Sequence, residues 1–306
     1  MTTAPADPAR QHAAATLDRA RRAYLRACTL DVAVRKPGNV SQASPGHGMQ
    51  AAQFIASAQA SAPALFCVGA RLGARIEAAV QASWAVVGCN TNLGIVLLCA
   101  PIALAVERCP QARTPEALCA AIDAVLAAAD VTDTAAVYRA IAHARPGGLG
   151  HAPREDVHAP PTLALRAAMA LAADRDRIAR HYRDGYTALA DTAQATLGPD
   201  RWHTSGDDDN IAMPTPQAVL RCHLTLLAQA PDSHIARKHG LATAEAVQQD
   251  AARWCADPRL AMSEADLEHD PAYIAWDESL KSRGINPGTT ADLTVAALLL
   301  AALGCA

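Results

Sequence analysis

Apolar residues recur along this chain at spacings of three and four, as expected for helices that pack one face against a core. In the segment 114–130, TPEALCAAIDAVLAAAD, the residues Leu118, Ile122 and Val125 share one face, and the Thr-Pro start supplies an N-cap and a first helical residue. The same start recurs at Thr215 in TPQAVLRCHLTLLAQ. No alternating strand pair and no Asn-Gly hairpin interrupts this periodicity. The pattern therefore predicts an all-α fold.

Two apolar runs, 93–106 and 293–306, are hydrophobic on every side and predict helices at the centre of the fold. Each run has about 14 residues, whereas a bilayer span needs roughly 20. We therefore expect core helices of a soluble protein rather than membrane spans. The N-terminus lacks the apolar core of a signal peptide, and we expect about residues 1–10 to be disordered.

Loops rich in glycine and proline separate the predicted helices without reaching the length of a flexible linker. They lie at 36–48, 145–161, 204–210 and 283–290. Because the chain has no internal repeat, a single domain over residues 1–306 is the simplest organisation. Binding and catalytic residues concentrate on loops that a rigid scaffold positions. We therefore expect the chemistry on these loops and on the CNTN segment at 89–92.

Composition narrows the class of protein. The chain of 306 residues is 51% hydrophobic but only 4% aromatic, which favours close helix packing. Its formal net charge of -3 provides no general basic field for nucleic acid. Nine scattered cysteines without a CxxC pair indicate reduced thiols in a cytoplasmic protein rather than a disulfide framework or a zinc site.

Three polar residues, Asn90, Thr91 and Asn92, stand directly before the apolar run that begins at Leu93. Burying such groups without partners costs roughly 1–3 kcal/mol each, so either the fold or a ligand must satisfy them. Capping of the following helix is one explanation. The other is an anion site built from these side chains and the amides of the helix N-terminus.

The segment KPGNV at 36–40 places Lys36 beside a Pro-Gly turn. Backbone amides at Gly38 and Asn39, together with this cation, would form a cradle for an anion, and an ordinary turn that ends a helix is the alternative. Neither GxxxxGK[ST] nor GxGxxG occurs in the chain. The segment is therefore a candidate phosphate contact outside the common nucleotide-binding motifs.

A second charged cluster, APDSHIARKHG at 230–240, brings Asp232, His234, Arg237 and Lys238 within two helical turns. Two cations on one short helix are suited to phosphate, and a neighbouring carboxylate is suited to a metal that phosphate also binds. The alternative is a solvated, charged helix end. We expect phosphate contacts from the two cations and a metal near Asp232.

Further acidic residues are candidates for metal binding or proton transfer. Glu77 lies on a predicted helix with two arginines and could ligate a metal, act as a base or form surface ion pairs. Asp292 heads the second apolar run, where stabilisation of the helix N-terminus alone could explain it. Asp156 or Glu155 in GHAPREDV could supply an active acid, and the turn GDDDN at 206–210 could hold Mg²⁺ or be merely solvated.

Taken in order along the chain, from about Leu30 to Leu300, these pieces resemble the triphosphoribosyl-dephospho-CoA synthase family. The matching pieces are KPGNV, GHGM followed by FIASA, RIEAAV leading into CNTNLG, PPTLALRAAMALAADRDRIARHY, PDSHIARKHG and PGTTADLTVAALL. The resemblance implies an all-α enzyme that uses ATP and Mg²⁺. Its reaction joins the ribose C1 of ATP to the 2′-hydroxyl of 3′-dephospho-CoA and releases adenine. The product is the precursor of the prosthetic group on the acyl carrier subunits of citrate lyase and malonate decarboxylase.

The resemblance also implies roles for the candidate residues. Cleavage of an N-glycosidic bond develops oxocarbenium character that carboxylates stabilise, while cations and Mg²⁺ hold the triphosphate. A carboxylate or His47 would take the proton of the hydroxyl. We assign catalysis to Glu77, Asn90, His47 and Asp156, substrate or phosphate binding to Lys36, Gly38, Asn39, Thr91, Asn92, Arg237 and Lys238, and metal binding to Glu77, Asp232 and Asp292.

The chain departs from one branch of this family. Members linked to citrate lyase typically read NTHKG where this chain has Asn92 and Leu93, and Gly48 stands where their HxDM segment has an acid. In this the chain is similar to the branch of archaea and methylotrophic bacteria, which implies an alternative role in the biosynthesis of a one-carbon cofactor of the methanopterin or methylofuran type. A non-catalytic helical binding protein is the third alternative.

In each case we expect a small nucleotide or phosphorylated partner, no nucleic acid and no membrane, and the chain could form a homodimer.

Overall fold

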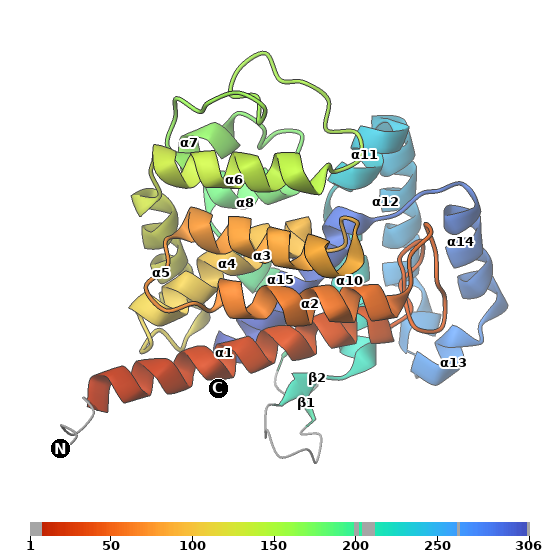
Figure 1. Cartoon of the computed structure of the whole chain (residues 1–306). Coiled ribbons are helices and arrows are strands. Elements are labelled where there is room, and N and C mark those ends of the chain that lie inside the picture. The colour runs from red at the N-terminus through yellow and green to blue at the C-terminus, as the bar shows by residue number, and fades with distance from the viewer. Residues whose placement is uncertain (1–7, 199–201, 204–211, 262–263, 305–306) are drawn as a thin grey trace.

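The computed structural model describes residues 8–198, 202–203, 212–261 and 264–304, which form fifteen α-helices (Figure 1). The predicted all-α fold is confirmed. One antiparallel pair of two-residue strands, β1 (Trp202–His203) and β2 (Met213–Pro214), was not expected from the sequence. The expected disorder of about residues 1–10 falls mostly on residues outside the described part, and the GDDDN turn lies wholly outside it.

The helices fall into three groups along the chain. The first group is α1 (Pro8–Ala33), α2 (Ala51–Leu65), α3 (Leu72–Val87), α4 (Leu93–Arg108), α5 (Pro115–Ala128) and α6 (Val131–Ala144). Three shorter helices follow, α7 (Leu165–Ala170), α8 (Arg177–Asp184) and α9 (Thr187–Thr196). The last group is α10 (Pro216–Gln229), α11 (Ser233–His239), α12 (Leu241–Ala256), the 3₁₀ helix η2 (Pro258–Ala261), α13 (Glu264–Glu268), α14 (Pro271–Ser282) and α15 (Gly288–Gly304).

The predicted Thr-Pro helix starts are confirmed at α5 and α10. The hydroxyl of Thr114 accepts the Ala117 amide at 3.2 Å, and that of Thr215 accepts the Ala218 amide at 3.3 Å. In both helices proline occupies the first turn, where its missing N–H would have no helical partner. These caps therefore fix the two helix starts from local sequence alone.

The two apolar runs form the centre of the fold, as predicted. Helix α4 is buried from Leu93 to Val106, and α15 is buried on almost every side because α1, α4, α9 and α10 surround it. A layer of α1, α2, α3 and α6 packs side by side in that order across the front of these central helices (Figure 1). Apolar burial of this extent is the main source of folding free energy.

Helix α4 also contains Pro101, which cannot donate the usual hydrogen bond to the carbonyl four residues earlier. That carbonyl belongs to Leu97, and it accepts the Tyr182 hydroxyl at 2.6 Å. The Tyr186 hydroxyl donates to the adjacent Leu98 carbonyl at 3.0 Å. Both tyrosines are fully buried. The two tyrosine hydroxyls therefore attach the α8–α9 region to the central helix next to Pro101.

Two further expectations concern membrane spans and the cysteines. No helix in the described part of the chain is long and apolar enough to cross a membrane. The eight cysteines that the structure describes are all free thiols, as expected.

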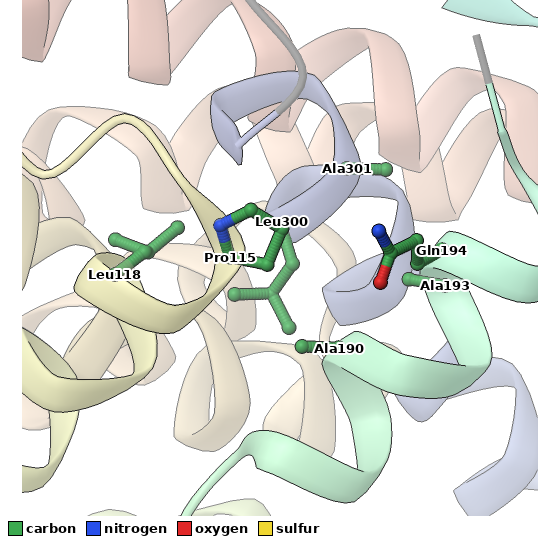
Figure 2. Close-up of a pocket in the computed structure, with 7 residues that line it drawn as sticks. All are labelled: Pro115, Leu118, Ala190, Ala193, Gln194, Leu300 and Ala301. Carbon is green, nitrogen blue, oxygen red and sulfur yellow. The ribbon is translucent and has the colours of Figure 1, made fainter.

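A small hollow lies between α5, α9 and α15, beside Pro115, Gln194 and Leu300 (Figure 2). Its volume of about 10 Å³ admits one water at most, so it is not a ligand site.

Candidate active site

A cavity of about 530 Å³ lies where distant segments of the chain meet. Five segments form most of its wall, namely the loop at 34–50, the turn at 88–92 with the start of α4, the loop at 145–164, the 175–179 segment with α11, and the start of α15. Residues of α1, α2, α6 and α7 complete the wall. This volume is within the range of about 300–1,000 Å³ that small-molecule sites occupy. All five of these segments contain loops or motifs that the sequence singled out.

The polar cluster before α4 lies on the cavity wall. The Asn90 Oδ1 accepts the Leu93 amide at 3.1 Å and so caps the helix. The Thr91 hydroxyl shares a 2.5 Å hydrogen bond with Ser57, and the Asn92 Nδ2 donates to the Ser83 hydroxyl at 3.0 Å. The fold therefore satisfies part of the polar cluster, while all three side chains still border the cavity.

Asp292 faces the start of α4 across the cavity wall. A Cβ atom on Gly94 would lie 2.0 Å from the Asp292 Oδ2, so only glycine at this position leaves room for the carboxylate. Among the described residues none forms a hydrogen bond with this carboxylate. Burial raises its pKa well above the usual range, the neighbouring Asp31 and Asp232 raise it further, and Arg237 opposes these shifts. The site therefore contains a carboxyl group whose charged form no described hydrogen-bond donor stabilises.

Asp31, near the end of α1, also lines the cavity and is buried. Burial raises the pKa of Asp31, and Lys36 opposes this shift. The Lys36 Nζ lies 3.1 Å from the Asp31 Oδ1 and donates to its backbone carbonyl. Lys36 is fully buried behind the cavity wall, and there its positive charge balances the negative charge of Asp31. The expected phosphate contact of Lys36 would require this ion pair to open.

The cavity also contains two arginines. Arg237 in α11 lines it, and its Nη1 donates to the Asp176 Oδ2 at 2.6 Å. Asp176 in turn caps α8 through the amides of Ile178 and Ala179, so the pair is anchored to a helix start. Arg175 lines the cavity beside it. The two arginines are therefore cations available to an anionic ligand.

Lys238, the second cation expected at phosphate, is exposed and lies off the cavity wall. Its side chain packs beside Gly147 on the loop at 145–164. The adjacent Gly148 has a φ of +74°, and a Cβ atom there would lie 2.9 Å from the Arg237 carbonyl. The loop therefore lies so close to the end of α11 that position 148 requires glycine.

His234 in α11 lines the cavity between the arginine and the start of α15. Its ring packs against Gly288, and no described residue forms a hydrogen bond with it. Burial lowers its pKa to about 4, Asp232 opposes this shift, and the positive charges of Arg237 and Lys238 reinforce it. The imidazole is therefore neutral at physiological pH, and its ring nitrogens have no hydrogen-bond partner among the described residues.

Two of the expected metal ligands are occupied elsewhere. The Glu77 carboxylate accepts both the Nε and the Nη2 of Arg139 at 2.7 Å, which joins α3 to α6 away from the cavity. Asp232 is fully buried and accepts four hydrogen bonds at 2.7–3.0 Å, from the amides of His234 and Ile235 and from the amide and hydroxyl of Thr290. Both carboxylates therefore have structural partners that a metal would have to displace.

The GHGM segment forms a tight turn in which His47 and Gly48 have φ angles of 55° and 73°. Left-handed conformations at both central positions favour glycine, which gives a backbone reason for Gly48 in place of the acid. The His47 Nε2 hydrogen-bonds the Gly38 carbonyl at 2.8 Å, outside the cavity wall. Asn39 does line the cavity, and its Nδ2 donates to the Asn286 Oδ1 at 2.9 Å.

Asp156 lies on the loop at 145–164 and borders the cavity. The amides of His158 and Ala152 donate to its carboxylate at 2.9 and 2.7 Å, and these hydrogen bonds lower its pKa. An aspartate with a lowered pKa is ionised at neutral pH and cannot act as a general acid there. Its contacts instead fold the loop that covers the cavity.

Across the described residues, no three His, Cys, Asp or Glu side chains converge as a metal site made only by protein would require. Mg²⁺ bound with a nucleotide needs less, because phosphate and water supply most of its oxygen ligands and one or two carboxylates suffice. Asp292 is such a carboxylate, because no described residue donates a hydrogen bond to it, whereas Asp31 and Asp176 would first have to release Lys36 and Arg237. The described lining therefore leaves one unpaired carboxylate for a metal that would enter with a polyphosphate.

Several residues of the cavity wall were not predicted as site residues, among them Asp31, Arg175, Asp176, His234 and Asn286. Asp31 did leave a trace in the sequence, since it interrupts an apolar stretch between Leu30 and Val32. Asp176 has the appearance of an ordinary N-cap. Their proximity depends on the meeting of distant segments, which local patterns do not contain.

The described part of the fold and its cavity define the class, an all-α enzyme with a small-molecule site built from amides, carboxylates and arginines. The chain belongs to the ATP:dephospho-CoA triphosphoribosyl transferase family, whose family model matches residues 17–306. It is accordingly a transferase of the triphosphoribosyl-dephospho-CoA synthase type.

A solved structure shares this fold. It is that of an Archaeoglobus fulgidus protein provisionally named triphosphoribosyl-dephospho-CoA synthase, with a TM-score of 0.60 and 24% sequence identity, over 82% of this chain and 99% of that one. No curated protein sequence matches the chain.

Proposed function

We propose that the chain transfers the triphosphoribosyl group of ATP to the 2′-hydroxyl of 3′-dephospho-CoA. The bond between C1′ and N9 of ATP breaks, and a bond forms between C1′ and the acceptor oxygen. Adenine leaves with the bonding electron pair and takes up a proton, while the acceptor hydroxyl loses one. The three phosphates stay on the transferred ribose.

The observation that best supports this proposal is the meeting of Asp292, Asp31 and Arg237 in one cavity of a chain from this family. Positive charge develops on the ribose as the glycosidic bond breaks, and a preorganised carboxylate stabilises such charge. Asp292 suits this role because it lines the cavity without a hydrogen-bond donor among the described residues, and a cation that enters with the nucleotide would favour its charged form. Arg237 and Arg175 suit the triphosphate, for which arginine provides charge-assisted hydrogen bonds.

We infer that Mg²⁺ enters with the nucleotide and that Asp292, with Asp31 or Asp176, would hold it. When bound, the ion would neutralise phosphate charge and screen the three carboxylates from one another. The raised pKa of Asp292 supports this, because its causes after burial are the neighbouring negative charges that a cation would offset. Asp176 keeps Arg237 oriented through their ion pair.

We assign the removal of the hydroxyl proton to His234 rather than to His47. A general base must reach the proton it removes, and His234 faces the cavity with a free ring whereas His47 is bound to the Gly38 carbonyl. Asn39, Thr91 and Asn92 provide uncharged hydrogen-bonding groups along the same wall. We expect these to orient the ribose and the acceptor.

The reaction is tested by incubating the purified chain with ATP, Mg²⁺ and 3′-dephospho-CoA and measuring adenine by chromatography. We expect adenine only when acceptor and Mg²⁺ are both present. ATP that stays intact across a range of acceptor and Mg²⁺ concentrations would contradict the proposal.

One observation supports a different acceptor as the second candidate. Asn92 is held by Ser83, and the apolar Leu93 borders the cavity, so this part of the wall contains no cation. Described carboxylates on the wall outnumber its arginines, which disfavours a second strongly anionic substrate beside ATP. A phosphorylated intermediate of one-carbon cofactor biosynthesis would be such an alternative. Adenine release with a pterin or furan acceptor, and none with 3′-dephospho-CoA, would favour it.

A further inference from the structure

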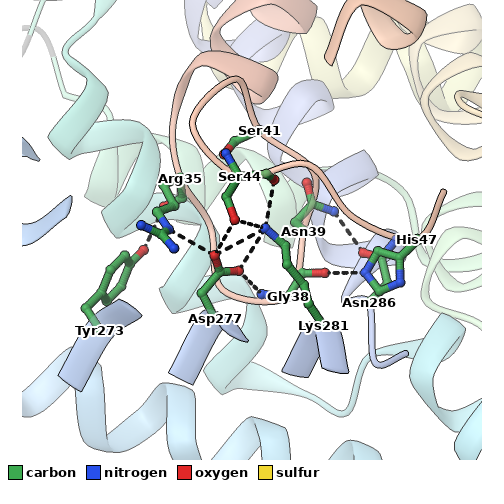
Figure 3. A network of polar contacts seen from close by, with 10 residues as sticks. All are labelled: Arg35, Gly38, Asn39, Ser41, Ser44, His47, Tyr273, Asp277, Lys281 and Asn286. Carbon is green, nitrogen blue, oxygen red and sulfur yellow. Dashed lines mark hydrogen bonds and ion pairs between the residues drawn. The ribbon is translucent and has the colours of Figure 1, made fainter. Parts of the chain in front are cut away.

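A buried carboxylate outside the cavity wall holds one of the loops that form it. Asp277 in α14 is fully buried and accepts hydrogen bonds from the Gly38 amide at 2.8 Å, the Ser44 hydroxyl at 2.7 Å and the Arg35 Nε at 2.9 Å (Figure 3). The Lys281 Nζ lies 3.1 Å from its Oδ1. No local sequence pattern singles out this residue.

Three of these partners belong to the loop at 34–50, so one side chain fixes that loop at three points. Further contacts from α14 reinforce the attachment. The Tyr273 hydroxyl donates to the Arg35 carbonyl at 2.7 Å, and the Lys281 Nζ donates to the Ser44 carbonyl at 2.8 Å. We call Asp277 with these partners the loop clamp.

The clamp holds the loop at very close range. Gly38 has a φ of +77°, and a Cβ atom there would lie 2.9 Å from the Ile285 carbonyl oxygen. The backbone of the loop therefore touches the segment that connects α14 to α15. This contact sets the distance between the loop at 34–50 and the segment at 283–287, which both contribute to the cavity.

Gly38 is followed directly by Asn39, which faces the cavity. The Asn39 Nδ2 donates to the Asn286 Oδ1 at 2.9 Å, and both amides lie on the cavity wall (Figure 3). The hydrogen bond from Gly38 to Asp277 therefore ends one residue away from a group that a ligand would touch. Movement at Asp277 would be transmitted to Asn39 through a single peptide unit.

We propose that Asp277 is a positioning residue, which sets the placement of Asn39 and Asn286 for the nucleotide without touching it. This inference rests on the proposed function, because it assigns these amides to substrate binding. Loss of the carboxylate charge would loosen the loop at three points and leave Arg35 and Lys281 without their shared counter-ion.

The test compares Asp277→Asn with Asp133→Asn, a matched change elsewhere. Asp133 in α6 is also buried and accepts hydrogen bonds from a glycine amide, Gly73 at 2.9 Å, and from an arginine, Arg71 at 2.8 Å. It lies off the cavity wall. Both substitutions remove a buried, paired charge, so a merely structural role predicts similar kinetics for the two folded variants.

We expect Asp277→Asn to raise the KM for ATP about tenfold or more with a much smaller change in kcat, because it removes substrate contacts rather than chemistry. Asp133→Asn should leave both parameters near the wild-type values. Asn39→Ala should raise KM as Asp277→Asn does. The double variant of Asp277 and Asn39 should be no worse than its more affected single variant, since both act through one contact.

Equal KM values for Asp277→Asn and Asp133→Asn would overturn the inference, as would effects of Asp277→Asn and Asn39→Ala that multiply. If Asp277→Asn does not fold, Ser44→Ala removes one hydrogen bond of the clamp and should raise KM by a smaller factor. Wild-type activity is measured first. If the wild type releases no adenine, the proposed reaction fails, and the same variants are compared by their Kd for ATP with Mg²⁺.

Discussion

Asp232 and Asp292 lie near each other at two helix starts, and the sequence marked both as metal candidates. In the folded chain their situations are opposite. Asp232 accepts hydrogen bonds from two amides of α11 and from the amide and hydroxyl of Thr290, so its lone pairs are in use. Asp292 faces the cavity, and no described residue donates to it. The number of donors around a carboxylate thus separates a structural cap from a group free to act on a ligand.

The same substitution at both positions tests this contrast most strongly. Asp292→Asn should lower kcat by about 10³ or more, because it removes charge stabilisation of the transition state and a metal ligand. Its free energy of unfolding at pH 7 should equal or exceed that of the wild type, since the raised pKa means that folding disfavours this charge. Adenine release and urea unfolding measure the two effects. A stable Asp292→Asn variant with full activity would contradict the assignment of Asp292 to catalysis.

His234 sharpens the comparison because it lies two residues after Asp232 and yet faces the cavity. His234→Gln should lower kcat by roughly 10²–10³, the scale of a general base, and leave the unfolding free energy nearly unchanged. The matched control is His47→Gln, which changes the histidine bound to Gly38. A larger loss from His47→Gln than from His234→Gln would reverse the assignment of the base.

Asp232→Asn should act on stability instead. The amide would present N–H groups to the donors of Thr290, and the loss of two charge-assisted hydrogen bonds should cost about 2–4 kcal/mol. Below the urea concentrations that unfold the variant, kcat should stay within a factor of about 3 of the wild-type value. A large loss of kcat without loss of stability would show that Asp232 belongs with Asp292.

The smallest effect concerns pH. Burial lowers the pKa of His181, which lies outside the cavity wall, to about 4. In the unfolded state His181 has an ordinary pKa near 6.5, so it binds a proton there at a higher pH than in the folded state. Its contribution to the free energy of unfolding is therefore fully present above pH 6.5 and is lost as pH decreases toward 4. The loss from this group is at most about 3 kcal/mol. Urea unfolding at pH 7, 6 and 5 should show a shallower decline for His181→Gln. A steeper or identical decline would contradict the assignment.

Much of the fold followed from local patterns. The Thr-Pro starts at Thr114 and Thr215 specify their own helix boundaries, and the all-apolar run from Leu93 has no stable place except the interior. The strand pair at Trp202 and Met213 was missed because two residues per strand are too few for an alternating pattern. Local sequence is therefore sufficient where a helix is long or capped.

The site was less predictable, because its chemistry depends on which neighbour takes each charge. Nothing local distinguishes Lys36, whose cation balances Asp31, from Arg237, whose cation reaches the cavity. Glu77 is paired with Arg139, which lies 62 residues further along the chain. Asp277 was missed for the same reason, since its partners Arg35, Gly38 and Ser44 come from the other end of the chain. Long-range pairing decides which charges stay available.

The most direct measurement is mass spectrometry of the acceptor after reaction with ATP and Mg²⁺, with adenine quantified in the same sample. The account predicts an acceptor that has gained a triphosphoribosyl group, formed in equal amount with adenine by the wild type and greatly reduced in Asp292→Asn. An unmodified acceptor, or one that gains phosphate while ADP forms and no adenine appears, would contradict it.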